Sequence, residues 1–235
     1  MPRTARAAVG GYCYHVVNRS NRRAETFHGP DDYAAFAQLM RRATARIPMR
    51  VLAWCLMPNH FHVVLWPEGN DDLADWLHWL LTTHACRYNR RHRLTGHVWQ
   101  GRSHTFPIQE DDHLFSVLRY VERNPLRANL VARAEDWAWS SLRERLTRPA
   151  IPWLHAGPLT LPSDWPKYVS EAQTEAELSR LRQSVKRGCP FGSDAWVKTT
   201  AARLGLEYTL RPRGRPPKCH KRDESGTAGL LFQQE

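Results

Sequence analysis

The chain has 235 residues, of which 42% are hydrophobic and 24% are charged, and its formal net charge is +11 at pH 7. This composition indicates a soluble globular protein with a substantial core and excludes a disordered chain. No apolar run approaches the roughly 18 residues of a membrane helix, and the basic N-terminus lacks the apolar middle of a secretory signal. We therefore expect a cytoplasmic protein without a membrane partner.

The first half of the chain predicts three strands and one helix. Residues 12–19 (YCYHVVNR) are rich in aromatic and β-branched side chains, which favours a strand. Residues 30–47 predict an amphipathic helix with an acidic N-terminal cap. Residues 49–58 and 60–66 predict two more strands, which a Pro-Asn turn makes antiparallel.

The pattern continues with two further helices and a fourth strand. Residues 71–93 predict a helix with aspartates at its start and arginines at its end, as the helix dipole favours. Residues 97–109 contain the fourth strand. Residues 110–124 predict a third helix, which Pro125 ends or kinks because the residue before a proline is biased away from α-helix.

This order of elements indicates an α+β fold, with a ferredoxin-like antiparallel sheet and helices packed on one side. We predict that this domain spans residues 1–147. A proline-rich linker is expected over residues 148–170 and a helical C-terminal segment over residues 171–210. Residues 211–235 form a basic tail that we expect to be disordered.

The cysteines indicate free thiols in a reducing compartment. They are odd in number and scattered, and no C-x-x-C pair occurs, which argues against zinc fingers and disulfide frameworks. The five are Cys13, Cys55, Cys86, Cys189 and Cys219.

The positive charge is unevenly distributed. Lys and Arg number 34 against 23 Asp and Glu, yet the first 24 residues and residues 76–109 contain no acidic residue. A merely solubilising surface would intersperse the two signs. The acid-free stretches instead indicate a polyanionic partner, usually nucleic acid.

Two histidines interrupt the apolar stretch MPNHFHVVLW. Side chains alternate along a strand, so His60 and His62 project from one face, with backbone positions about 7 Å apart. They could bind one metal ion, or they could be two polar residues on a solvated face. A zinc hydrolase of the H-x-H-x-D-H type is excluded, because Val64 stands where its Asp is required.

Tyr120 and Asn124 are spaced to share a face of the third predicted helix. Tyr120 lies beside the apolar stripe, where a tyrosine is by default a packing residue with its hydroxyl in water. As a nucleophile it would face an obstacle, because a phenol with the usual pKa of about 10 is mostly protonated at neutral pH. A nearby metal ion or arginine would favour the phenolate.

These motifs together resemble a known family. MPNHFH on a strand followed by YVERNPLRANLV on a helix is similar to the REP-associated tyrosine transposases, of the single-tyrosine HUH (insertion-sequence-like) transposase superfamily. The segments YHVVNRSNRR, VWQGRSHTFPIQED and WAWSSL extend the resemblance over about residues 10–145, and the C-terminal part matches more loosely.

The resemblance implies a site and a reaction. His60 and His62 match the paired metal ligands, Asn124 matches a third metal-facing side chain, and the implied metal is Mg²⁺ or Mn²⁺. Tyr120 matches a nucleophile that cleaves and rejoins single-stranded DNA through a covalent 5′-phosphotyrosine. The phosphodiester energy is kept in that link, so no nucleotide cofactor is implied.

The implied substrates are imperfect hairpins of repetitive extragenic palindromes. The acid-free segments suit phosphate contacts, and we predict that Arg19, Arg22, Arg23 and Arg102 make them. Trp99 is the tryptophan that we expect to stack on unpaired bases.

The tail sequence RPRGRPPK resembles an AT-hook, in which Arg213 and Arg215 would enter the minor groove of A·T-rich DNA. A basic tail with generic affinity for nucleic acid is the alternative, and the sequence leaves both open.

Two other functions remain as alternatives to a strand-transfer enzyme. One is a hairpin-DNA-binding regulator that does not cleave. The other is a metal-dependent hydrolase or nuclease that uses water, with Tyr120 merely structural. We expect a monomer associated with the bacterial nucleoid, although a dimer is also compatible with the sequence.

Overall fold

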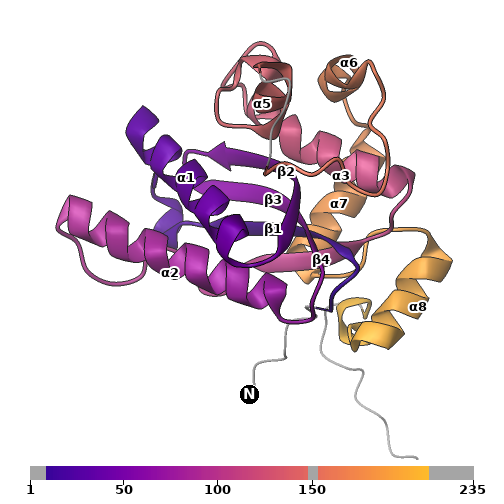
Figure 1. The fold of residues 1–235 in the computed structure, drawn as a ribbon. Helices are drawn as coiled ribbons and strands as arrows, with labels where there is room; N and C mark the ends of the chain where they lie inside the picture. Colours follow the sequence, from indigo (N-terminus) through magenta and orange to yellow (C-terminus); the bar gives the residue numbers. More distant parts are fainter. Residues whose placement is uncertain (1–8, 148–152, 212–235) are drawn as a thin grey trace, which may run out of the picture.

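A four-stranded antiparallel sheet forms the centre of the protein, as a computed structural model describes it for residues 9–147 and 153–211 (Figure 1). The strands are β1 (Cys13–Arg19), β2 (Met49–Met57), β3 (His60–Pro67) and β4 (His104–Ile108), in the order β2-β3-β1-β4. All three pairings are antiparallel. The predicted strands and the α+β class are confirmed.

One face of the sheet is covered by α1 (Pro30–Arg46) and α2 (Asp72–His92), as Figure 1 shows. Phe61, Val63 and Leu65 of β3 point into this core, where they meet apolar residues of both helices. The alternation predicted for β3 is therefore present, because the residues between them face the opposite side.

Helices also cover the second face, which corrects the expectation of helices on one side only. Here α3 (Asp112–Glu122) packs on the sheet, followed by the short α4 (Asn124–Arg127) and by α5 (Ser141–Thr147). The physical reason is that β1, β2 and β3 are apolar at alternate positions on this face too. Among these residues are Cys13, Ala53, Cys55 and Val64.

The C-terminal part forms three more helices: α6 (Trp165–Ser170), α7 (Glu175–Arg187) and α8 (Asp194–Leu204). Short 3-10 turns lie at Asn21–Arg23 (η1), Ala134–Asp136 (η2) and Glu207–Thr209 (η3). The tail predicted for residues 211–235 lies outside the described residues from position 212 onward. No helix in the described part of the chain is long and apolar enough to span a membrane.

The described part of the predicted linker packs against the domain. Leu154 bridges to Val51 of the edge strand β2, and the indole of Trp165 donates a hydrogen bond of 2.6 Å to the carboxylate of Glu122. The fully buried Glu122 also accepts a hydrogen bond from Ser141 at 2.5 Å and lies 3.5 Å from Arg145. This carboxylate therefore ties α3 to both α5 and α6.

Trp99 is a core residue, which corrects its prediction as a base-stacking surface. Only 6% of it is exposed, and its ring lies 5.3 Å from that of Phe61, 5.7 Å from Phe36 and 5.2 Å from His84, between ring centroids. The cause is an antiparallel bridge between Trp99 and Ser20, which turns the indole inward at the end of β1.

We expect Trp99→Leu to lower the free energy of unfolding by about 3 kcal/mol, because it leaves a cavity in the core. Urea denaturation measures this change. The folded variant should bind hairpin DNA within twofold of wild type. A base stacked on an aromatic ring contributes about 1–3 kcal/mol to the binding free energy. A tenfold loss of DNA affinity in the folded variant would therefore show that Trp99 does stack on a base.

The buried His84 makes the stability depend on pH. Burial lowers its pKa to about 4, so folding excludes a proton that the unfolded chain accepts below about pH 6.5. The stability it contributes is present above pH 6.5 and is lost as the pH falls toward 4. When the pH is lowered from 7 to 5, the free energy of unfolding of His84→Leu should fall by about 2 kcal/mol less than that of wild type. Urea denaturation at the two pH values measures this difference.

The control for this measurement is His78→Leu, which removes an exposed histidine from the same helix. If His84→Leu and His78→Leu lose stability equally between pH 7 and pH 5, then the buried imidazole of His84 is not the source of the dependence.

Candidate active site

The start of β3 holds two imidazoles against α3. The Pro58–Asn59 turn leads into the strand, and the rings of His60 and His62 lie on the same face with centroids 5.0 Å apart. Nδ1 of His60 lies 2.7 Å from the side-chain oxygen of Asn59. His62 is buried, so the alternative of a solvated sheet face does not apply to it.

A third histidine joins this pair from the neighbouring strand. His15 of β1 is fully buried, and its Nε2 lies 2.9 Å from Nδ1 of His62. Sequence reasoning missed it, although it lies in the segment YHVVNRSNRR. The signal that would have found His15 is the register between β1 and β3, in which Val17 pairs with His62. His15 lies two residues before Val17 on β1, so it projects from the same face of the sheet as His62.

All three imidazoles are neutral at physiological pH. Burial lowers the pKa of His15 to about 3 and that of His60 to about 4, and it holds the pKa of His62 well below its usual range. The charges of Arg19 and Arg127 lower the pKa values of His60 and His62 further. Neutral rings keep a nitrogen lone pair that can bind a metal ion.

Tyr120 reaches this cluster from α3. The helix begins at Asp111, whose carboxylate accepts a hydrogen bond from the backbone of His113, and its apolar face packs on the sheet. The ring centroid of Tyr120 lies 5.7 Å from that of His62 and 6.2 Å from that of His15. Only 6% of the residue is exposed, so its ring is closely packed, as the default expectation of a packing residue implies.

The short helix α4 brings two more polar groups to the tyrosine. Asn124 is buried, and its side-chain oxygen accepts a hydrogen bond of 2.6 Å from Nη2 of Arg127. The guanidinium carbon of Arg127 lies 4.2 Å from the centroid of the Tyr120 ring. Sequence reasoning missed Arg127. Its only sequence signal is its position three residues after Asn124, one helical turn away.

The donor atoms around Tyr120 fit a divalent cation. Nδ1 of His60 and Nδ1 of His62 are engaged with Asn59 and His15, which leaves Nε2 of each ring for a ligand. Asn124 adds an amide oxygen. In the described residues, no group of three or more His, Cys, Asp or Glu side chains could hold a metal ion, so such an ion needs Asn124 or an oxygen from a substrate.

The arginines predicted to contact DNA lie at the end of the sheet at which β1 ends and β3 begins. Arg22 and Arg23 are exposed on the η1 turn with φ values of 57° and 60°, a left-handed conformation that is strained for arginine. The side-chain amide of Asn59 donates to the carbonyl of Arg23, and the backbone N–H of Gln100 donates to that of Arg19.

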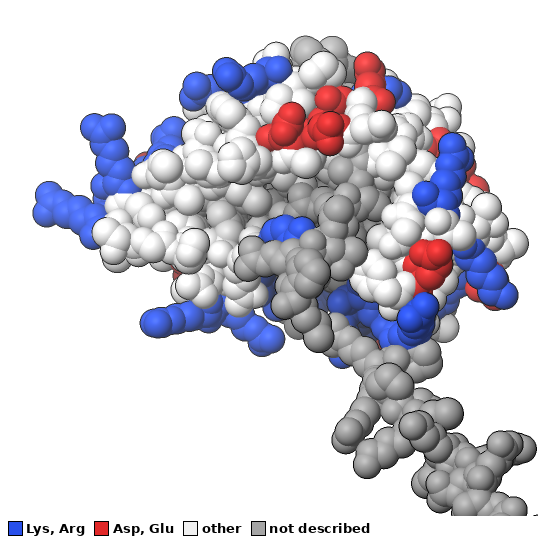
Figure 2. All heavy atoms as spheres, turned by 90° about the horizontal axis from the view of Figure 1, so that it is seen from below, with Lys and Arg blue, Asp and Glu red and all other residues white. Residues whose placement is uncertain are grey.

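These two hydrogen bonds join the loop to the turn before His60 and to the segment that contains the exposed Arg102. Figure 2 shows Lys and Arg side chains projecting from the left edge of the molecule, the edge at which α2 ends in Figure 1. The predicted Arg213 and Arg215 lie outside the described residues.

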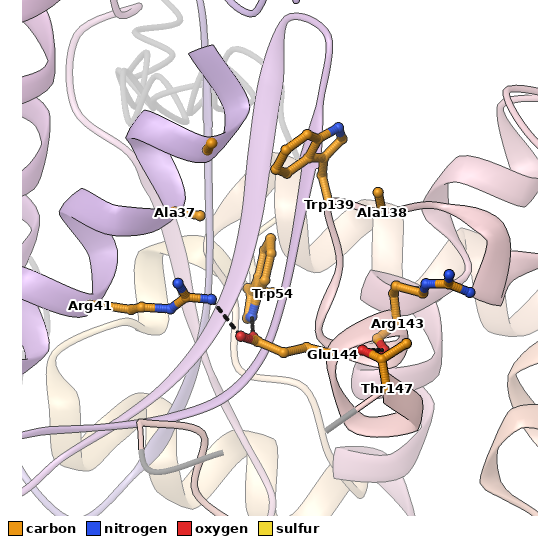
Figure 3. Close-up of a pocket in the computed structure, with 9 residues that line it drawn as sticks. Ala37, Arg41, Trp54, Ala138, Trp139, Arg143, Glu144 and Thr147 are labelled. Atoms are coloured by element: carbon orange, nitrogen blue, oxygen red, sulfur yellow. Dashed lines mark hydrogen bonds and ion pairs between the residues drawn. The ribbon is translucent and has the colours of Figure 1, made fainter. Parts of the chain in front are cut away.

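A separate hollow of about 260 Å³ lies beside β2, between α1 and α5 (Figure 3). Its polar groups bind one another: the carboxylate of Glu144 lies 2.5 Å from Arg41 and accepts a hydrogen bond of 3.2 Å from the indole of Trp54. Trp139 stacks on Tyr33 nearby. These pairs fasten α5 to α1 and β2 and indicate a structural role.

Comparison with known proteins identifies the family. Residues 8–124 match the family model described as transposase IS200-like. A putative REP-associated tyrosine transposase of Haemophilus influenzae is 26% identical over 127 residues, which cover 50% of this chain and 72% of the relative.

A solved structure, described as the REP-associated tyrosine transposase bound to a REP hairpin, has the same fold. It matches with a TM-score of 0.53 at 21% identity and covers 74% of this chain and 100% of that chain. The resemblance predicted from the sequence is confirmed, and the chain belongs to the IS200-like transposase family.

Proposed function

We propose that the protein cleaves and rejoins single-stranded DNA beside hairpins, with Tyr120 as the nucleophile. The observation that carries this proposal is the packing of the Tyr120 ring against both His62 and the Arg127 guanidinium. A tyrosine between two neutral imidazoles and a cation is suited to attack an anionic phosphodiester.

In the proposed reaction, Tyr120 Oη attacks the scissile phosphorus. A bond forms between Oη and phosphorus, and the bond from phosphorus to the 3′-oxygen breaks. The phenol loses its proton to solvent, and the leaving 3′-oxygen takes one up as a 3′-hydroxyl. The reverse step, with the same or another 3′-hydroxyl, rejoins the strand. The phosphodiester is conserved throughout, so no nucleotide cofactor is required.

His60, His62 and Asn124 would hold the divalent cation, Mg²⁺ or Mn²⁺, that this family implies. When bound, such an ion polarises a phosphate oxygen and stabilises the charge that develops during transfer. Two imidazoles are an unusual share of the ligands for Mg²⁺ or Mn²⁺, both of which prefer oxygen donors. His15 would keep the His62 ring oriented by its hydrogen bond to Nδ1.

Hairpin DNA of the repetitive extragenic type is the proposed substrate. The half-buried Arg19 and the exposed Arg22, Arg23 and Arg102 lie near the turn that leads into His60, so they could hold the DNA backbone while the scissile phosphate reaches Tyr120. Tyr120 packs against His62 of its own chain, which supports cleavage in cis, and we propose a monomer.

We expect wild-type protein, incubated with a hairpin-bearing single-stranded oligonucleotide and Mn²⁺, to form a protein–DNA adduct that survives denaturing electrophoresis. Tyr120→Phe should abolish the adduct and keep the DNA affinity within about threefold, because the phenyl ring retains the packing. Tyr208→Phe, which alters an exposed tyrosine far along the chain, serves as the control and should form the adduct normally.

The other outcomes support the two alternatives. Binding by wild type without any adduct or cleavage would favour a non-cleaving hairpin-binding regulator. Cleavage that persists in Tyr120→Phe would favour a hydrolase that uses water and would end the tyrosine mechanism.

A further inference from the structure

Arg127 lies among the groups of the site, but it forms no ion pair with any of them. Its guanidinium covers one face of the Tyr120 ring at 4.2 Å, and Nη2 donates to the amide oxygen of Asn124. The cation therefore adjoins the proposed nucleophile and one of the proposed metal ligands, Asn124.

The second terminal nitrogen of Arg127 has no partner. Nη1 is buried and makes no hydrogen bond within the described part of the chain. A buried polar group without a hydrogen-bond partner destabilises the folded protein, and more so when the group is charged. The arginine as a whole is only half-buried, so other parts of its side chain reach the surface although Nη1 is covered.

A second arginine of the same region provides a comparison. Arg119 of α3 lies 4.4 Å from the ring centroid of Tyr168, and it also forms a salt bridge of 2.8 Å with Glu177. Arg127 has the same contact with a tyrosine ring, but none of the ion pairs between described residues includes it. The carboxylate of Glu122, on the adjoining helix, is already occupied by Ser141, Trp165 and Arg145.

None of the described residues supplies an anion to this nitrogen, so an anion from outside the described part of the chain can occupy it. We propose that Nη1 of Arg127 binds a non-bridging oxygen of the scissile phosphate and holds it beside Tyr120. This inference rests on the proposed function and adds a catalytic residue to it. Arg127 remains protonated throughout and transfers no proton. It neutralises charge on the phosphate while the bond from Oη to phosphorus forms and the bond to the 3′-oxygen breaks.

The geometry of α4 prepares the guanidinium for this role. Pro125 follows Asn124 at the start of the helix, and one turn later Arg127 returns over the tyrosine. With one nitrogen on Asn124 and its plane over the ring, the fork is fixed before DNA arrives. A lysine carries the same charge, but its single ammonium group cannot reproduce the planar fork.

The experiment compares full-length wild type, Arg127→Gln and Arg127→Lys on two oligonucleotides that carry the same REP-type hairpin. One has an ordinary scissile phosphate. The other has a methylphosphonate, in which a neutral methyl group replaces one charged oxygen. The rate of adduct formation with Tyr120 is measured under single-turnover conditions, and a thermal melt checks that each variant is folded. Arg203→Gln is the control, since Arg203 lies over the Tyr12 ring at 5.9 Å, on the exposed α8.

On the ordinary phosphate, Arg127→Gln should react about 100- to 1,000-fold more slowly than wild type, the usual effect of removing one such donor. Arg127→Lys should lose about tenfold and Arg203→Gln nothing. On the methylphosphonate, wild type and Arg127→Gln should react within about threefold of each other, because the charge that Arg127 balances is absent.

An equal loss on both substrates would assign Arg127 a structural role and overturn the inference, as would an unchanged rate in folded Arg127→Gln. If Arg127→Gln does not fold, the comparison of Arg127→Lys with wild type on the two substrates decides in the same way. An adduct that requires Tyr120 but not Arg127 removes only this inference, whereas an adduct that persists in Tyr120→Phe removes the proposed function with it.

Discussion

The side chains of β3 alternate between two buried faces, and the site depends on this constraint. Phe61, Val63 and Leu65 anchor the strand in the core beneath α1 and α2, which commits His60 and His62 to the other face. On that face α3 packs over the strand and buries His62, so the imidazole needs an internal partner. His15 provides it from β1. A slip of one residue in the pairing of β3 would turn His60 and His62 into the core and the three apolar residues toward α3, which would remove the site.

The charges of the site are those expected for an anionic substrate. Its imidazoles are neutral, its tyrosine is covered by a guanidinium, and within the described residues no carboxylate forms an ion pair with Arg127. The strained arginines of the η1 turn fit the same purpose, because left-handed non-glycine residues persist where the surrounding contacts hold them and often mark functional loops.

Much of the domain was predictable, because its signals are local. Period-two and period-3.6 patterns define the four strands and the first three helices, and the spacing of Tyr120 and Asn124 places both near one end of α3. His15 and Arg127 were not predictable in this way. The role of His15 depends on how β1 pairs with β3, and that of Arg127 depends on the direction in which the chain returns after Pro125. Trp99 misled because its basic neighbours indicate a loop, whereas its bridge to Ser20 turns it into the core.

Glu122 explains why a carboxylate two residues from Tyr120 takes no part in the site. Because a two-residue separation places side chains on roughly opposite sides of a helix, Tyr120 faces β3 whereas Glu122 faces α5 and α6. There Ser141, Trp165 and Arg145 bind its oxygens. The position of the Glu122 carboxylate therefore has two consequences. Its contacts with the C-terminal half of the protein fix the helix that carries Tyr120, and the carboxylate points away from the place where the phosphate would bind. Trp165, which lies beyond the predicted sheet domain, thus helps to set the position of Tyr120, so that this part of the chain belongs to the architecture of the candidate site.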